Sequence, residues 1–185
     1  EDVKAKESIT NAERLATEGD DWTQLCSIYN LKGVILFIDR KFDSALYLYN
    51  KAYEIGKNHS IDPIHLPRII SNIGECYAGE NPALAFRYFD QALSLARETG
   101  NKIAEASIMG IMGRVHLDQN DLKSAETYLQ SSLTLARALG LRRVMRQVYG
   151  NLVDIRLMQG KGNDAVVYLR QYHAVRDSLL NTAKV

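Results

Sequence analysis

The sequence has little that would interrupt a helix, because only 3 of its 185 residues are proline. Proline breaks helix interiors, and all three lie between residues 63 and 82, so the stretches on either side can be helical throughout. A charge excess is also lacking, with 23 Lys and Arg against 22 Asp and Glu. This balance argues against a dedicated nucleic-acid binder, which needs a strongly basic face. The longest apolar run, Val34 to Ile38, is far shorter than the roughly 18 residues of a membrane span.

The sequence also lacks the motifs that carry catalysis or hold a cofactor. None of its 4 histidines is spaced from another histidine or a cysteine as zinc ligands are. No nucleophile elbow, phosphate loop or dinucleotide fingerprint occurs. The two cysteines, Cys26 and Cys76, are too few for a disulfide framework and are expected to be small buried apolar side chains. The sequence therefore predicts no enzyme, no catalytic residue, no metal and no cofactor, and leaves the redox compartment open.

One pattern recurs along the whole chain with a period of 40 residues. Alanines mark it at Ala5, Ala45, Ala85, Ala125 and Ala165. Four residues after each alanine stands a large apolar residue: Ile9, Tyr49, Phe89, Leu129 and Leu169. Three residues further on, most side chains are small: Ala12, Ala52, Ala92, Ser132 and Tyr172. These three positions share one face of an α-helix, so the pattern predicts a helix that a neighbour approaches closely while the large residue fills the gap.

A second helical pattern precedes four of these alanines. At matching positions it carries Gly33, Gly74, Gly113 and Val153. Each repeat is therefore predicted to consist of a first and a second helix, placed in the first repeat at about 21–38 and 42–58. The turn at 79–82 is one residue shorter than its counterparts, and the connection around His59 to Pro67 restores the period.

Some helix ends can be placed from the residues that favour them. Pro82 suits the first turn of its helix, whereas Pro67 lies one turn after Pro63, so that helix either starts late or bends there. The glycines that suit the residue after a second helix are Gly56, Gly100 and Gly140. The candidate N-caps of second helices are Asp121 and either Asn163 or Asp164.

This arrangement resembles the tetratricopeptide repeat (TPR), a helix pair with glycine in its first helix and Ala, a large residue and Ala in its second. The matching sets are Gly33/Ala45/Tyr49/Ala52, Gly74/Ala85/Phe89/Ala92, Gly113/Ala125/Leu129/Ser132 and, more weakly, Val153/Ala165/Leu169/Tyr172. The resemblance implies an all-α fold, a right-handed superhelical solenoid of about nine antiparallel helices. Because the usual unit has about 34 residues, both helices are expected to be longer here. His116 stands where the repeat usually has Tyr, so it is expected to pack within its own repeat.

The chain is predicted to form a single TPR solenoid over residues 1–185. An unpaired helix of the second type comes first, at 1–19, and four repeats follow it. These repeats are placed at 20–59, 60–99, 100–139 and 140–181.

The function implied by this resemblance is non-catalytic binding of a protein or peptide whose identity the sequence does not give. The segment YHAVRDSLLN, 172–181, resembles the closing helix of TPR regions in Bacteroidetes-type sensor kinases and regulators. That likeness implies the scaffold or sensory input region of a bacterial signalling protein. It favours an extracytoplasmic location over a cytoplasmic one. Homo-oligomerisation through exposed terminal helices, such as a homodimer, and an accessory role beside an enzyme are the alternatives.

Candidate groove residues lie on the first helices, on either side of the glycine position. Two residues before that position stand Asn72 and Asn151, whose amides can donate and accept hydrogen bonds at once. An asparagine at this place resembles the residue that grips the ligand backbone in peptide-binding TPR proteins. The alternative is a hydrogen bond to another residue of the solenoid itself. The whole candidate groove set is Asn30, Arg68, Ser71, Asn72, Glu75, Arg114, Gln147, Asn151 and Asp154.

The other groove positions are either small or charged. Three residues before the glycine position stand Asn30, Ser71, Gly110 and Gly150, which form either an open floor or a close packing contact between helices. One residue after it, the charges alternate, so salt bridges of Glu75 with Arg114, or of Arg114 with Asp154, are the alternative to ligand binding. The one basic concentration is Arg142, Arg143 and Arg146, which suits an acidic partner or a phosphate, or else is a solvated helix start.

Overall fold

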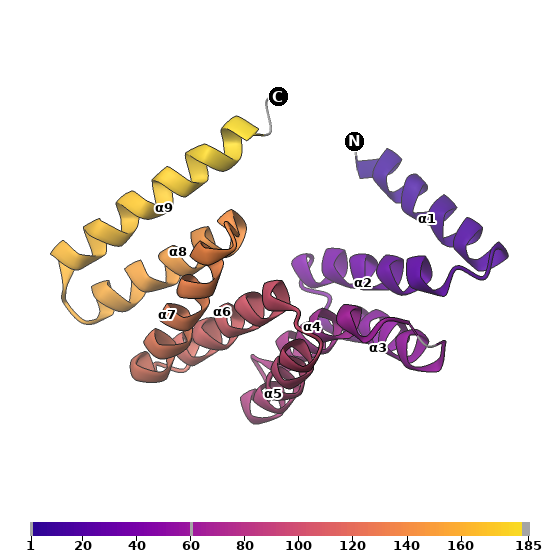
Figure 1. Cartoon of the computed structure of the whole chain (residues 1–185), viewed down its shortest axis with the longest axis horizontal. Coiled ribbons are helices and arrows are strands. Elements are labelled where there is room, and N and C mark those ends of the chain that lie inside the picture. Colours follow the sequence, from indigo (N-terminus) through magenta and orange to yellow (C-terminus); the bar gives the residue numbers. More distant parts are fainter. Residues whose placement is uncertain (1, 60, 183–185) are drawn as a thin grey trace. The chain divides into compact units, whose positions relative to one another are not determined.

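A computed structural model describes residues 2–59 and 61–182, and the side chains within 7–59 and 61–180. Over these residues the fold is all-helical, with nine α-helices and one short 3-10 helix (Figure 1). The prediction of an all-α, TPR-like solenoid is confirmed. The α-helices are α1 (Asp2–Glu18), α2 (Trp22–Ile38), α3 (Phe42–Asn58), α4 (Leu66–Tyr77), α5 (Pro82–Glu98), α6 (Lys102–Asp118), α7 (Leu122–Ala138), α8 (Arg142–Met158) and α9 (Gly162–Thr182), and the 3-10 helix η1 is Pro63–His65. Residue 60, where the second repeat is predicted to begin, and the side chain of Ala5 lie outside the described residues.

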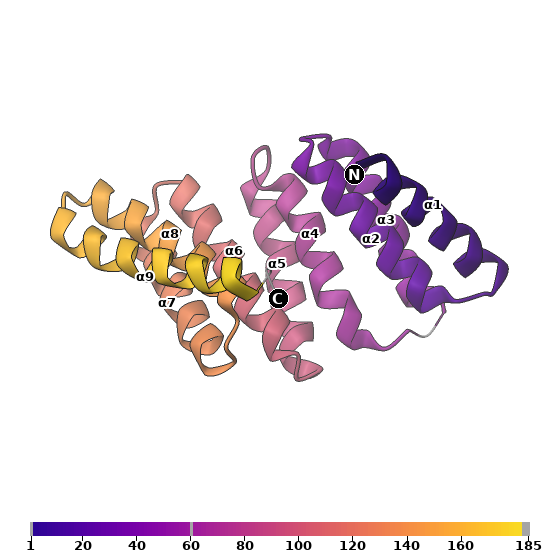
Figure 2. The ribbon, with the colours of Figure 1, turned by 90° about the horizontal axis from the view of Figure 1, so that it is seen from above.

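The helices pack in consecutive pairs, α2 with α3, α4 with α5, α6 with α7 and α8 with α9, while α1 contacts α2 (Figures 1 and 2). The first helices of the repeats are therefore α2, α4, α6 and α8, and the second helices are α3, α5, α7 and α9. The chain forms two compact units, unit 1 (Glu1–Thr99) and unit 2 (Gly100–Val185).

The 40-residue period follows from the length of the helices. The helices α2, α3, α6, α7 and α8 each have 17 residues, and a short turn follows each of them except α3, whose connection to α4 is longer. Most turns contain one residue with positive φ, such as Arg40, Asn120 or Gly140, which reverses the chain within a few residues. Asp121 is the N-cap of α7 and accepts from the Ser124 N–H, as predicted. Pro82 lies in the first turn of α5, also as predicted.

At three helix ends the structure selects between the predicted alternatives or differs from the prediction. The first helix of repeat two starts late, because η1 takes up Pro63 and α4 begins at Leu66. Gly56 does not end α3, which continues to Asn58. A Cβ on Gly56 would lie 2.5 Å from Leu66 Cδ2, so this glycine makes room for the start of α4. Neither Asn163 nor Asp164 is an N-cap, because α9 begins at Gly162 and both lie in its first turn.

The core of three hairpins rests on a large side chain packed over a glycine of the facing helix. A Cβ on Gly33 would lie 2.5 Å from Tyr49 Cε1, and a Cβ on Gly113 would lie 2.6 Å from Leu129 Cγ. Gly74 and Phe89 form the same contact between α4 and α5. The buried large residues therefore fill space that only glycine leaves open.

The fourth repeat breaks this rule, and here the repeat pattern is wrong about the packed residue. Val153 replaces the glycine, so a large residue of α9 has no glycine opposite it on the facing helix. Leu169 is accordingly 41% exposed. Tyr172 of the same matching set does pack against the core of unit 2, and Tyr168 packs beside it.

The remaining predictions about packing concern the cysteines and one histidine. Cys26 is buried, as predicted, and its thiol lies 3.3 Å from the Ala52 carbonyl oxygen. Cys76 of α4 is only half-buried, so the prediction of a buried side chain is wrong for this cysteine. His116 stacks on Tyr128 at a centroid distance of 5.4 Å, which confirms that it packs within its repeat.

Candidate functional site

In unit 1, two candidate groove residues form one hydrogen-bonded pair between neighbouring first helices. Asn72 of α4 donates from Nδ2 to the Asn30 Oδ1 of α2 at 2.9 Å. Asn30 is only 4% exposed, whereas Asn72 is half-buried. The hydrogen bond within the solenoid, which was the alternative to ligand binding, therefore exists, and it holds the Asn72 amide in one orientation. Because the carbonyl oxygen of an amide accepts while its N–H groups donate, Asn72 keeps an acceptor for a further donor.

The other candidates of unit 1 lie on α4 at three different depths. Arg68 is exposed, Glu75 is half-buried and Ser71 is buried. A buried serine does not reach a ligand, so at this position close packing of the helices is the better interpretation. Arg68 and Glu75 are the charged side chains that α4 adds near the asparagine pair.

In unit 2, the candidates divide between α6 and α8. Arg114 of α6 pairs with Asp118 one turn further along the same helix, at 3.0 Å. Sequence reasoning missed this partner, although a spacing of four residues is the usual one for ion pairs on a helix. On α8, Gln147 and Asp154 are exposed and Asn151 is half-buried. These three side chains form a polar row along one helix.

The two glycines of this face serve different purposes. A Cβ on Gly110 would lie 3.2 Å from Ser132 Oγ, which is a tight contact, so Gly110 is a packing glycine. A Cβ on Gly150 would lie 3.8 Å from Tyr172 Cε2, an ordinary van der Waals distance. Packing therefore explains Gly110 and leaves Gly150 as a position where α8 could carry a side chain.

The predicted basic concentration lies at the start of α8. Arg142 and Arg143 are exposed and Arg146 is half-buried. The N-cap, Leu141, provides no side-chain hydrogen bond to this helix start. The two exposed arginines, Arg142 and Arg143, therefore form a solvated positive surface where the helix dipole is also positive.

Two further arginines that are near this cluster in sequence serve the packing of unit 2. Arg137 donates to the Tyr149 hydroxyl oxygen from Nη2 at 2.8 Å and from Nε at 3.1 Å. Arg156 binds the Glu126 carboxylate, with Nη1 to Oε2 at 3.0 Å. Hydrogen bonds from Arg156 lower the pKa of the Glu126 carboxyl below its ordinary value. The sequence gives no signal for this pair, whose members are 30 residues apart.

A feature that sequence reasoning missed is an apolar cavity of about 320 Å³ at the start of unit 1. Residues from three helices line it: Ile9, Thr10, Lys32, Ile35, Leu36 and Leu48. A second cavity of about 360 Å³ adjoins it and shares Leu36 and Leu48. At the edge of the first cavity, Lys32 of α2 forms an ion pair with Glu13 of α1.

The described residues contain no group of three His, Cys, Asp or Glu side chains placed to hold a metal ion. In the same part of the chain, no helix has both the length and the apolar character needed to cross a bilayer.

Paired helices at a 40-residue period, with glycine beneath a large residue in three of the four pairs, define a TPR solenoid. The model of the MalT-like TPR region matches residues 2–179, and the chain belongs to this family. No curated protein matches the chain.

Several solved structures share the fold. BtubC (BKLC) from P. vanneervenii is 18% identical, with a TM-score of 0.72 over 96% of this chain and 77% of that one. The Rap conjugation gene regulator of the plasmid pLS20, solved in complex with the Phr* peptide, is 17% identical, with a TM-score of 0.70 over 86% of this chain and 44% of that one. Aspartyl phosphate phosphatase F from Bacillus subtilis is 15% identical, with a TM-score of 0.57 over 83% and 49%. The chain thus spans less than half the length of the last two proteins, and at these identities the likeness concerns the fold.

Proposed function

We propose that this chain is a non-catalytic peptide- or protein-binding module that uses the polar face of its first helices. The observation that carries the proposal is the Asn72–Asn30 hydrogen bond, which fixes a half-buried amide between two first helices. A preorganised amide loses little conformational freedom when it binds a peptide, which favours affinity. The peptide-bound Rap regulator, which shares the fold, supports a peptide as the class of ligand.

The proposed contact is between side-chain amides and the backbone of an extended peptide. Each peptide residue offers one N–H and one carbonyl group, and an Asn side chain can bond to both kinds of group. Asn72 supplies such an amide in unit 1 and Asn151 in unit 2. Charged neighbours, Glu75 in unit 1 and Asp154 in unit 2, would then select the ligand's side chains.

A peptide library displayed on phage provides the test, because the library itself supplies the candidate ligands. Peptides selected on the whole chain are expected to bind the double variant Asn72→Ala, Asn151→Ala at least about tenfold more weakly, a loss of about 1.4 kcal/mol. The matched control is Gln130→Ala, an exposed amide on the second helix α7. Selected peptides that bind the double variant as well as the native chain would show that these asparagines are not the site.

We further propose that the module belongs to a bacterial signalling protein, as its scaffold or sensory input region. The resemblance of residues 172–181 to the closing helix of Bacteroidetes-type sensors supports this context. In the structure the backbone of this whole segment lies within α9. The sequence of the complete natural gene product is the test, and a protein with no signalling output region would contradict the proposal.

Self-association through α9 is a second candidate, because this helix exposes several apolar side chains. These are Val166, Val167, Leu169 and Leu180. Sedimentation velocity over a wide concentration range tests the idea, and Leu169→Lys is expected to abolish any dimer. A monomer at every concentration would contradict it.

A further inference from the structure

The net charge of the whole chain is close to zero, but its two units differ in charge. Unit 2 contains 12 Lys and Arg against 7 Asp and Glu, whereas unit 1 contains 11 against 15. Within unit 2 no Asp or Glu occurs from Thr127 to Val153. The same stretch contains the arginines Arg137, Arg142, Arg143 and Arg146. An excess of positive charge in one part of a chain favours a negatively charged partner there.

Four other cations of unit 2 each have a carboxylate as partner. The pairs are Lys102 with Glu105, Arg114 with Asp118, Arg156 with Glu126, and Arg176 with Asp177. The carboxylates that α6, α7 and α9 contribute to these pairs are therefore already neutralised, and these are the helices that pack against α8. Within the part of unit 2 that the structure describes, the arginines at 142, 143 and 146 have no carboxylate partner.

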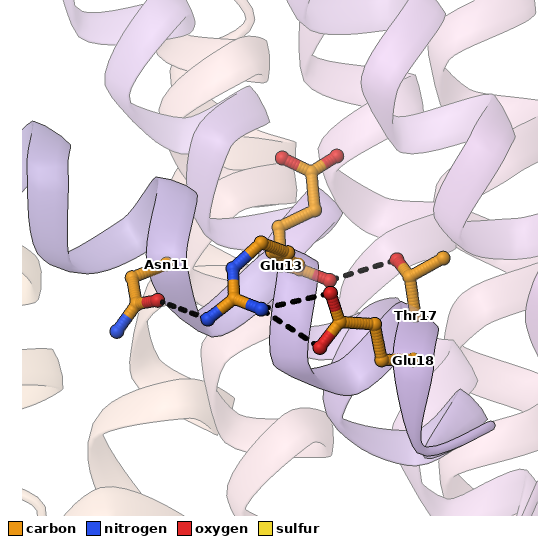
Figure 3. Close-up of polar contacts among 5 residues, drawn as sticks. Asn11, Glu13, Thr17 and Glu18 are labelled. Atoms are coloured by element: carbon orange, nitrogen blue, oxygen red, sulfur yellow. Dashed lines mark hydrogen bonds and ion pairs between the residues drawn. The ribbon is translucent and has the colours of Figure 1, made fainter.

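An arginine of unit 1 shows how a guanidinium is satisfied on these helices. Arg14 of α1 donates from Nη1 to both carboxylate oxygens of Glu18, four residues later, at 2.8 Å. It also donates from Nη2 to Asn11 Oδ1 at 3.1 Å (Figure 3). Four residues after Arg142, by contrast, stands Arg146. Like charges at this spacing, at a helix start whose dipole is positive, destabilise the helix. Binding therefore explains the arginine cluster better than a role in folding.

Exposed aliphatic side chains border the arginines. Leu139, the C-cap of α7, is 42% exposed, and Leu141, the N-cap of α8, is half-buried. As first helices of consecutive repeats, α6 and α8 run in the same direction, and a Cβ on Gly110 would lie 3.6 Å from Val148 Cγ2. Seven residues before these two positions stand Ile103 and Leu141. Ile103, which is 60% exposed, is therefore level with the start of α8. This surface, the arginine edge, consists of Ile103, Leu139, Leu141, Arg142, Arg143 and Arg146.

The arginine edge lies at a position that stays accessible when a further repeat follows. Arg142 and Arg143 correspond to Lys102 and Ile103 one repeat earlier. Those two residues are exposed although α8 and α9 follow them in the same unit. The exposure of Arg142 and Arg143 is thus a property of the start of a first helix.

The size of the cluster selects among the possible negatively charged partners. Non-specific binding of DNA uses about 6–10 phosphate contacts, and recognition of anionic lipid uses clusters of about 4–8 Lys or Arg. The three arginines at 142, 143 and 146 are fewer than either. A sugar-phosphate backbone also offers no apolar contact to the leucines and the isoleucine of the edge. A carboxylate, in contrast, accepts two hydrogen bonds from a single guanidinium, so an acidic polypeptide fits a small cluster.

We infer that the arginine edge binds a short acidic segment of a partner protein, in which at least two Asp or Glu residues adjoin a large apolar residue. The carboxylates pair with Arg142 and Arg143, and the apolar side chain lies on Leu139 or Ile103. The charges orient the segment, and the apolar contact removes exposed aliphatic surface from water. This site uses none of the residues proposed above for peptide binding and does not depend on them.

A labelled peptide tests the inference on the whole chain. The probe is Gly-Ser-Glu-Glu-Leu-Glu-Glu-Leu-Ser-Gly, and two control peptides replace either its glutamates by glutamines or its leucines by serines. Fluorescence anisotropy at about 50 mM salt is expected to show saturation below about 1 mM, and binding should weaken as the salt concentration rises. The glutamine peptide should bind at least about tenfold more weakly and the serine peptide at least about threefold.

Variants of the protein locate the binding. The double variant Arg142→Ala, Arg143→Ala is expected to weaken binding of the probe at least about tenfold. The matched control, Lys123→Ala with Lys161→Ala, removes the same charge from two exposed lysines near the starts of α7 and α9 and should leave binding nearly unchanged. The charge-reversed variant Arg142→Glu, Arg143→Glu should instead bind a peptide whose glutamates are replaced by lysines.

The remaining measurements decide the class of partner and separate the two sites. Vesicles of phosphatidylglycerol and a single-stranded oligothymidylate are tested beside the peptide. The inference is overturned if the peptide does not saturate by about 1 mM, if the glutamine peptide binds equally well, or if the lysine double variant weakens binding as much as the arginine one. Tighter binding of the vesicles or the oligonucleotide at the same arginines also overturns it. The double variant Asn72→Ala, Asn151→Ala should leave binding of this peptide unchanged, so each proposed site can fail without the other.

The comparison of the three peptides uses the native chain, so its result does not depend on the folding of any variant.

Discussion

The Arg156 guanidinium of α8 binds both carboxylate oxygens of Glu126 on α7, Nη1 to Oε2 at 3.0 Å and Nη2 to Oε1 at 2.5 Å. It also lies 5.6 Å above the Tyr168 ring of α9. One side chain thus joins three consecutive helices of unit 2. Equivalent positions carry His116 stacked on Tyr128 in the preceding repeat, so the contact recurs while its chemistry changes.

Removing this arginine should destabilise unit 2. Arg156→Ala loses a two-pronged ion pair and the contact with Tyr168, and we expect a loss of about 1–2 kcal/mol in the free energy of unfolding. Urea denaturation followed by circular dichroism measures it. Arg142→Ala, at an exposed arginine of the same helix, is the matched control and should change stability by less than about 0.5 kcal/mol. Equal effects of the two variants would contradict the assigned role.

The ion pair of Glu126 and Arg156 also predicts that the stability of the folded chain depends on pH. Hydrogen bonds from Arg156 hold the pKa of Glu126 below its ordinary 4.5 in the folded chain. The unfolded chain therefore binds the proton more readily, and the contribution is present above the ordinary pKa and lost as the pH falls through the lowered one. The stability difference between the native chain and Glu126→Gln should shrink as the pH falls from about 6 to about 3. A difference that stays constant over this range would refute it.

The glycine contacts predict opposite effects of the same substitution at two places in unit 2. Gly113→Ala forces a Cβ to 2.6 Å from Leu129 Cγ, and we expect it to cost about 1–3 kcal/mol. Gly150→Ala meets no atom closer than 3.8 Å and should stabilise α8 by up to about 1 kcal/mol, because alanine favours a helix over glycine. Thermal unfolding of both variants checks the pair. A change of the melting temperature in the same direction for both variants would contradict the packing described for these two glycines.

The ionic junction of α1 and α2 predicts a gain from replacing both charges. Glu13→Leu with Lys32→Leu places leucines at the positions that Leu133 and Leu152 occupy in the core of unit 2, and should stabilise the chain by about 1–3 kcal/mol. Each single substitution should destabilise it, because one charge then loses its partner. Hydrogen exchange along α1 measures both effects in the affected helix. Slower exchange in either single variant would rule out this account.

Much of the fold was predictable because it depends on residues close in sequence or repeated at one period. The alanine positions and the glycine positions indicate helix pairs, and Asp121 and Pro82 mark helix starts by local chemistry. The candidate site was less predictable. The sequence places Asn30 and Asn72 on neighbouring first helices, yet nothing in it shows that they bond to each other, because that depends on how the two helices are turned.

The sequence by itself determined the helices, their length and the pairing of glycine with a large residue, since these follow from local propensity and from a steric rule that repeats every 40 residues. Only the tertiary structure decided which side chains the packing leaves out. Leu169 of α9 is exposed, whereas Tyr168 and Tyr172 of the same helix pack against the core of unit 2. In unit 1, Ile9 of α1 lines a cavity together with residues of α2 and α3. Such outcomes depend on the volume that neighbouring helices leave, and a single helix pattern does not contain that volume.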